Sequence, residues 1–195
     1  MSDKITNILI VGVGGQGIIL AGEIMAKVAL NAGFDVKKSE IHGMAQRGGS
    51  VNSQVRFGAK VNSPVIPEGE TDILLSFEKL EPLRWIAFNN KDTKAIINDQ
   101  IIHSMTTATG VQKYPDNVDE ELKNLFSSLK IVKAIDEAKK LGNVKVVNIL
   151  LLGLVARILP FEKQAWLDAL EQRLPKKVLE VNLKAFERGY ELGQA

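Results

Sequence analysis

An apolar strand that runs directly into a glycine-rich turn and then a helix constrains this fold more than any other feature. Residues 8–11 read ILIV, residues 12–17 read GVGGQG, and residues 16–31 place apolar side chains at helical spacing. This order predicts a strand over residues 7–11, a tight turn, and a helix over residues 16–31. Such a turn leaves backbone N–H groups at the helix start pointing into open space, where a phosphate or carboxylate binds well.

A second glycine-bearing loop follows about thirty residues after the first. Residues 42–50 read HGMAQRGGS, so that one cation, Arg47, stands beside two glycines that let the main chain approach a ligand closely. Arg47 fits either an anion contact or an ion pair with a partner subunit, and a surface salt bridge is the alternative. The candidate ligand-binding residues are Gly12, Gly14, Gly15, Gln16, Gly17, Arg47, Gly48 and Gly49.

The rest of the pattern predicts an α/β fold with a Rossmann-like, mostly parallel sheet, a β-hairpin insertion and a helical C-terminal third. Strands are expected over residues 34–41, 51–57, 72–77, 94–98 and 106–113. Residues 51–57 alternate like a half-exposed strand, and residues 61–66 are expected to pair with them in a hairpin. Helices are expected over residues 78–88 and 122–129, whereas residues 131–135 fit either a strand or the start of a helix.

After residue 143 the apolar period becomes helical. Residues 144–159 are expected to form a buried helix, and two amphipathic helices separated by Pro175 are expected to follow. The length of 195 residues suits one domain covering residues 1–195.

Composition excludes several classes of function. The net charge of +2 and the lack of a long basic cluster give no support for nucleic acid or an anionic membrane as a partner. There is no cysteine, which fits a reducing cytoplasm and excludes an iron–sulfur cluster held by this chain alone. The chain has two histidines, too few for a histidine-rich zinc site, so no metal site is expected. The N-terminus predicts no signal peptide.

The glycine spacing also fits the G-x-G-x-x-G dinucleotide fingerprint, which would make the chain a stand-alone NAD(P)-dependent oxidoreductase. That mechanism needs an acid at the end of the second strand to hold the ribose hydroxyls, and Glu40 is roughly in place. A competing interpretation is that the glycines only permit close strand–helix packing. No tyrosine–lysine or histidine–acid pair completes a catalytic site, and we name no catalytic residue.

Three stretches together resemble one known family. Residues 12–22 read GVGGQGIILAG, residues 42–51 read HGMAQRGGSV, and residues 141–143 read LGN, followed by Asn148. They are similar to the gamma-type subunit of 2-oxoacid:ferredoxin oxidoreductases. The HGMAQRGG form and the helices after Pro160 look most like the small (beta) subunit of indolepyruvate:ferredoxin oxidoreductase.

The resemblance implies a non-catalytic subunit of an enzyme that oxidatively decarboxylates a 2-oxoacid to acyl-coenzyme A and reduces ferredoxin. It implies that a large partner subunit carries thiamine diphosphate and the iron–sulfur clusters, and that this chain lines the approach of coenzyme A at the subunit interface. Two other functions stay open. One is the gamma subunit of a pyruvate or 2-oxoglutarate enzyme, and the other is an interaction module whose glycine loop is blocked.

Overall fold

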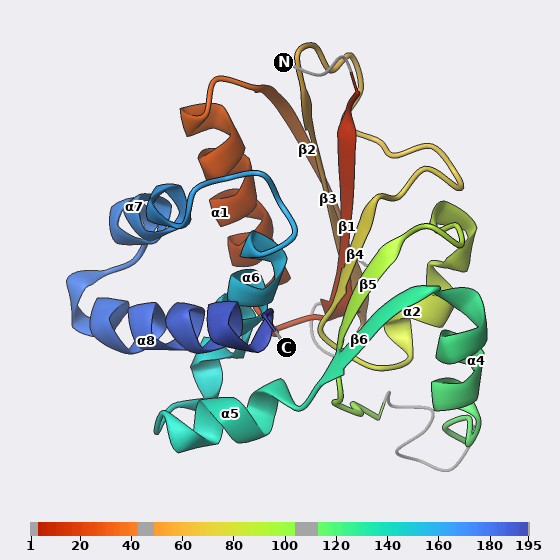
Figure 1. Cartoon of the computed structure of the whole chain (residues 1–195). Coiled ribbons are helices and arrows are strands. Elements are labelled where there is room, and N and C mark those ends of the chain that lie inside the picture. Colours follow the sequence, from red (N-terminus) through yellow and green to blue (C-terminus); the bar gives the residue numbers. More distant parts are fainter. Residues whose placement is uncertain (1–3, 43–48, 104–112, 195) are drawn as a thin grey trace.

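The computed structural model describes residues 4–42, 49–103 and 113–194, without the side chain of His42. Within these residues, six strands form one sheet in the order β2-β3-β1-β4-β5-β6 (Figure 1). β3 is antiparallel to both of its neighbours, and β1, β4, β5 and β6 pair in parallel. The mostly parallel α/β sheet is therefore confirmed. The strands are β1 (Thr6–Val13), β2 (Asp35–His42), β3 (Ser50–Gly58), β4 (Ile73–Ser76), β5 (Lys94–Asn98) and β6 (Ser128–Val132).

The predicted hairpin has a different partner from the one expected. β3 pairs with β2 from Asp35↔Gly58 to His42↔Val51, and on its other side with β1 from Thr6↔Phe57 to Val13↔Ser50. Both edges of β3 are thus occupied, and residues 61–66 form no strand. An antiparallel pairing of β3 with a strand next to it in the chain was predicted correctly, but the predicted partner over residues 61–66 was wrong. β3 is hydrogen-bonded to β2 on one edge and to β1 on the other, so no edge remains for residues 61–66.

The prediction that β3 is half-exposed was also wrong. Asn52, Gln54 and Arg56 alternate with apolar residues as a surface face would, yet they are 0%, 1% and 7% exposed. The segment over residues 61–67 lies against Gln54 and Arg56, and its backbone supplies hydrogen-bond partners to these two side chains. Arg56 donates to the carbonyls of Ser63 (3.0 Å) and Val65 (2.8 Å), and Gln54 Oε1 accepts the N–H of Ile66 (2.7 Å). The side chains of Gln54 and Arg56 on this face of β3 therefore hydrogen-bond to the backbone of a loop in place of solvent.

Helices cover both faces of the sheet (Figure 1). One face carries α1 together with α5, α6, α7 and α8, and the other carries α2 and α4. A large apolar core lies under the first group and a smaller one under the second. The helices are α1 (Ile18–Asn31), α2 (Glu81–Arg84), α4 (Val118–Leu125), α5 (Ala134–Lys140), α6 (Val147–Ala156), α7 (Lys163–Arg173) and α8 (Lys176–Leu192), with short 3-10 turns η1 (Ile86–Phe88) and η2 (Val144–Val146).

Two middle segments differ from the sequence prediction. The helix expected over residues 78–88 is broken into α2 and η1. The helix expected over residues 122–129 begins and ends earlier, as α4, because residues 128–132 form β6 at the edge of the sheet. Residues 131–135 thus include both the end of a strand and the start of α5. The strand predicted over residues 106–113 lies almost entirely outside the described residues.

The C-terminal third is helical, as predicted, and it packs very closely. Every residue of α6 is buried, and α6 crosses α8 where two glycines meet. A Cβ atom on Gly189 would lie 1.8 Å from the carbonyl oxygen of Leu150, and one on Gly153 would lie 2.2 Å from that of Phe186. The two backbones therefore touch without side chains between them. No helix within the described residues is long and apolar enough to cross a membrane.

Candidate functional site

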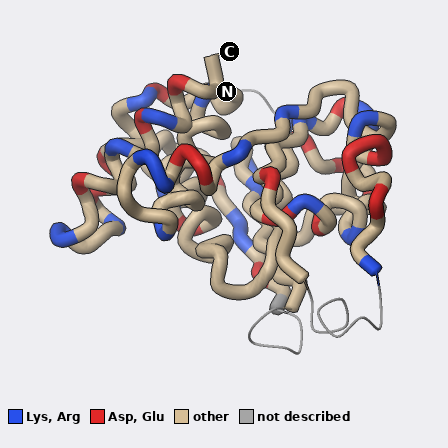
Figure 2. The backbone as a smooth tube through the Cα atoms, turned by 90° about the horizontal axis from the view of Figure 1, so that it is seen from below, with Lys and Arg blue, Asp and Glu red and all other residues tan. Residues whose placement is uncertain are grey.

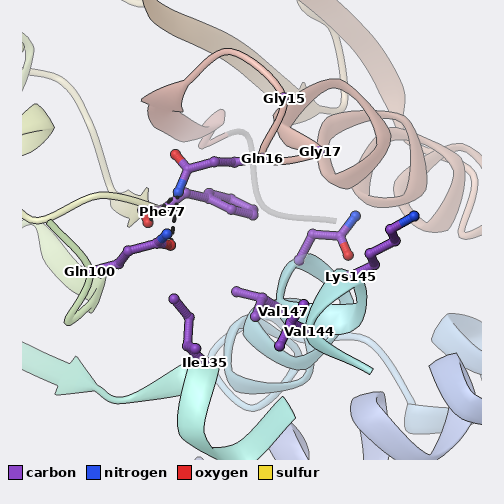
Figure 3. A pocket seen from close by; sticks show the side chains of 10 residues that line it. Gly15, Gln16, Gly17, Phe77, Gln100, Ile135, Val144, Lys145 and Val147 are labelled. Carbon is purple, nitrogen blue, oxygen red and sulfur yellow. Dashed lines mark hydrogen bonds between the residues drawn. The ribbon is translucent and has the colours of Figure 1, made fainter. Parts of the chain in front are cut away.

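A cavity of about 530 Å³ opens where β1, β4 and β5 end, at the edge of the sheet (Figure 3). After β1 the chain leads through α1 to β2 on one side, while after β4 it leads to β5 on the other side. The cavity therefore lies at the point where the winding of the sheet reverses, which is the usual ligand position in such folds. It is lined by Gly15, Gln16, Gly17, Phe77, Gln100, Ile135, Val144, Lys145, Val147 and Asn148.

Gln16 joins the three strand ends that surround this cavity. Its Oε1 accepts the N–H of Val13 (2.7 Å), and its Nε2 donates to the carbonyl of Phe77 (2.8 Å) and to Oε1 of Gln100 (3.1 Å). Figure 3 shows Gln16 and Gln100 reaching toward each other across the end of β4. Asn98 reinforces the junction by donating to the same Phe77 carbonyl (3.1 Å). The side chain of Gln16 thus holds the glycine turn in place.

The glycines of the first loop have distinct roles. Gly12 is buried, and a Cβ there would lie 2.9 Å from the Cβ of Phe77, so this position serves packing. Gly15 and Gly17 have φ values of +99° and +83°, a region that favours glycine, and both border the cavity. The N–H of Gly14 donates to the carbonyl of Gly49 (3.0 Å). The structure therefore brings the two glycine loops together, and this bond occupies one of the N–H groups expected to face a ligand.

Arg47 and Gly48 lie outside the described residues, as does the side chain of His42. Gly49 is described and directly precedes β3.

Seven of the ten lining residues were not among the candidates named from the sequence, and three of these seven have polar side chains that can contact a ligand. Lys145 and Asn148 come from η2 and the first turn of α6, and Gln100 follows β5. Asn148 belongs to the third stretch of the family resemblance, so a signal for it existed. No local pattern marks Gln100 or Lys145, because they reach the cavity only through the way the chain folds back.

Two buried glutamates lie on the opposite, α2-bearing face and anchor the loops there. Glu78 accepts backbone N–H groups of Leu80 (2.6 Å), Glu81 (3.1 Å) and Ile102 (3.2 Å), and it also accepts the hydroxyl of Tyr114 (3.1 Å). Burial raises the pKa of the Glu81 carboxyl, while the hydrogen bond from Ser50 opposes that shift. The position of these groups indicates a structural role.

The geometry does not support dinucleotide binding. The fingerprint requires the strand that carries the acid to lie next to β1, but β3 separates β2 from β1. Two strand spacings, or roughly 10 Å, therefore separate the strand of Glu40 from the glycine turn. Glu40 instead pairs with Lys38 on its own strand (2.6 Å).

The described residues form no group of histidine and acidic side chains that could hold a metal ion. Basic and acidic residues are interspersed over the part of the chain that the structure describes (Figure 2). The cavity beside the glycine loop is open, which differs from the blocked loop expected of a pure interaction module.

Comparisons with known proteins assign the family. The family model "Pyruvate ferredoxin/flavodoxin oxidoreductase" matches residues 7–192. The chain is 38% identical over 188 residues to indolepyruvate oxidoreductase subunit IorB of Archaeoglobus fulgidus, covering 94% of this chain and 93% of the relative. The chain is also similar to a solved structure, the gamma subunit of a keto/oxoacid ferredoxin oxidoreductase from Geobacter sulfurreducens. The two are 26% identical with a TM-score of 0.72, and the match covers 97% of this chain and 98% of the relative.

A longer protein contains the same fold. It is the 2-oxoglutarate:ferredoxin oxidoreductase of Magnetococcus marinus, solved with 2-oxoglutarate, coenzyme A and succinyl-CoA bound. The match covers 99% of this chain and 32% of the length of that protein. The TM-score is 0.78 and the identity 20%, so this likeness concerns the fold alone.

These findings show that the chain belongs to the pyruvate ferredoxin/flavodoxin oxidoreductase family. Its relatives along the full length are separate small subunits. The protein is accordingly the small subunit of a 2-oxoacid:ferredoxin oxidoreductase, and it acts as part of that oxidoreductase.

Proposed function

We propose that this chain is the small subunit of an indolepyruvate:ferredoxin oxidoreductase. The assembled enzyme would oxidatively decarboxylate an arylpyruvate to the acyl-coenzyme A and reduce ferredoxin. The observation that carries this proposal is the 38% identity to an indolepyruvate oxidoreductase subunit, against 26% to a general keto/oxoacid gamma subunit, each over nearly the whole chain. The proposal places the complex in the cytoplasm.

We assign the reactive groups to a large partner subunit. Iron–sulfur clusters need thiolate ligands, and the chain has no cysteine. Thiamine diphosphate needs a metal ion to hold its diphosphate, and the described residues form no metal-binding cluster. Thiamine diphosphate would supply the decarboxylation chemistry and the clusters would carry electrons to ferredoxin. This chain would assemble with the large subunit and line the binding site of one of the substrates of the complex.

That substrate is coenzyme A in our proposal. Support comes from the open cavity at the glycine turn, where Gly15 and Gly17 lie beside the start of α1. Backbone N–H groups at a helix start favour a phosphate, and Arg47, five residues past β2, would add a fixed positive charge. The fold relative from Magnetococcus marinus binds coenzyme A as a whole enzyme, which fits this assignment.

Reconstitution tests the identity of the enzyme. The chain is co-expressed with its large subunit, and the purified complex is assayed with indolepyruvate, pyruvate and 2-oxoglutarate, with ferredoxin or a dye as acceptor. We expect indolepyruvate to give the highest kcat/KM and the isolated chain to give no turnover. A preference for pyruvate or 2-oxoglutarate would reassign the substrate, and turnover by the chain alone would refute the assignment of chemistry to the partner.

Calorimetry on the same complex tests the role of Arg47. Because Arg47 would contact an anionic group, Arg47→Ala is expected to weaken coenzyme A binding about tenfold or more, the range of a lost charge-assisted hydrogen bond. Arg173→Ala, which removes an exposed arginine paired with Glu23, is the charge-matched control. Equal affinity in the two variants would exclude Arg47 from the site.

A further inference from the structure

The wall of the cavity at the glycine turn that η2 and the start of α6 supply offers hydrogen-bond donors and positive charge. None of the ten lining residues is acidic, and Lys145 is the one charged residue among them. Lys145 is exposed and has no ion-pair partner among the residues that the structure describes. Figure 3 shows its side chain extending from η2, on the opposite side of the cavity from Gln100. The formal charge of the residues that line the cavity is therefore +1.

The start of α1 adds to this positive charge. α1 has 14 residues, begins after Gly17, and has neither a side-chain cap nor an acidic residue in its first turn. Its first N–H groups therefore have no partner within the helix, and its dipole places partial positive charge at this end. A helix start alone does not define a site, but a second and independent feature points to the same place.

That feature is the buried amide of Asn148. The side chain is 6% exposed, and its Oδ1 accepts the N–H of Ile149 (2.9 Å), which fixes the orientation of the amide. The Nδ2 group is then directed at Gly17, where it would lie 2.6 Å from a Cβ atom if one were present. Nδ2 has no hydrogen-bond acceptor among the described residues, and Asn148 lines the open cavity. The donor is therefore held in a fixed orientation where an acceptor from outside the chain can reach it.

We propose that this cavity binds a phosphate group through Asn148 Nδ2, Lys145 Nζ and the first-turn N–H groups of α1. Phosphate fits better than a neutral ligand because the polar groups of this wall that have no partner within the described part of the chain, Asn148 Nδ2 and Lys145 Nζ, are donors and none of the lining residues carries a carboxylate. Gly17 is required at the helix start because any side chain would cover the amide donor. The inference rests on the proposed function only for the identity of the molecule that carries the phosphate. It does not depend on Arg47.

The site is tested by titrating the full-length chain and following the Asn148 side-chain amide and the amides of α1 by NMR. The titrants are inorganic phosphate, coenzyme A, and phenylpyruvate as a carboxylate without phosphate. We expect inorganic phosphate to shift these signals saturably, coenzyme A to bind more tightly and compete with it, and phenylpyruvate to have little effect.

Three variants complete the test. Asn148→Asp keeps the acceptor for the Ile149 N–H but replaces the donor with a negative charge, and it should abolish phosphate binding. Lys145→Gln should weaken binding five- to tenfold, and it keeps the test decisive if the first variant folds poorly. Lys177→Gln, an exposed lysine on α8, removes the same charge and should leave binding unchanged.

The outcomes separate this inference from the proposed function. Phosphate binding without competition by coenzyme A would support the phosphate site and contradict coenzyme A as its source. Absence of saturable phosphate shifts, equal affinity in wild type, Lys145→Gln and Lys177→Gln, or stronger binding of phenylpyruvate than of phosphate would overturn the site.

Discussion

The side chain of Gln16 is predicted to hold the glycine turn, and its removal should cost the chain measurable stability. Gln16→Ala deletes hydrogen bonds to the Val13 N–H, the Phe77 carbonyl and Gln100. Each such bond contributes about 1 kcal/mol net, so the three together amount to about 3 kcal/mol. Water from the adjoining cavity can replace part of this, and we expect a loss of roughly 2–3 kcal/mol. That is a large share of the total for a domain, about 5–15 kcal/mol.

Urea unfolding followed by circular dichroism measures this loss. The matched control is Gln164→Ala, because Gln164 is exposed and its hydrogen bond to Asp168 within α7 should contribute less than about 0.5 kcal/mol. Gln16→Glu adds a second arm. It keeps an acceptor for Val13 but places a carboxylate against the Phe77 carbonyl, so its stability should fall as the pH rises. If Gln16→Ala and Gln164→Ala unfold at the same urea concentration, the reasoning is wrong.

Two further predictions concern packing and buried charge. Gly189→Ala places a methyl group 1.8 Å from the Leu150 carbonyl, and we expect a net loss of about 2 kcal/mol, since overpacking outweighs a helix-propensity gain of about 1 kcal/mol. Gly193→Ala should lose less in the same urea experiment, because a Cβ there meets the Arg157 side chain and comes no closer than 3.3 Å to a backbone atom. Because burial raises the pKa of Glu81 above its ordinary value of 4.5, the folded state favours the protonated form, and this contribution to stability is lost as the pH rises through the folded pKa. Glu81→Gln cannot ionise, so its unfolding free energy relative to wild type should increase between acidic and neutral pH; a constant difference across that range would contradict the assignment.

The second half of the sheet shows where sequence reasoning reached its limit. β4 and β5 were located within a residue or two because they are short apolar runs between turn residues. α4 and β6 were displaced from the predicted positions because β6 is polar and half-exposed, so its apolar period is weak. It is a strand because β5 offers it a free edge, with pairing from Lys94↔Ser128 to Asn98↔Val132. No window of sequence contains that information.

The candidate site divides in the same way. The glycine turn was visible in the sequence because glycine is needed locally, at the positive φ values of Gly15 and Gly17. The far wall was not visible, since Lys145 and Asn148 are more than a hundred residues away along the chain and reach the cavity only when α6 packs beneath α1.

By itself the sequence determined the strand–turn–helix start, the mostly parallel sheet and the helical end, because hydrophobic period and glycine position act over a few residues. Only the tertiary structure decided that β3 lies between β1 and β2, that the polar face of β3 is buried under a loop, and that an amide of α6 faces the start of α1. These features depend on which strand edge is free and which polar group finds a partner, and those are competitions among segments far apart in the chain.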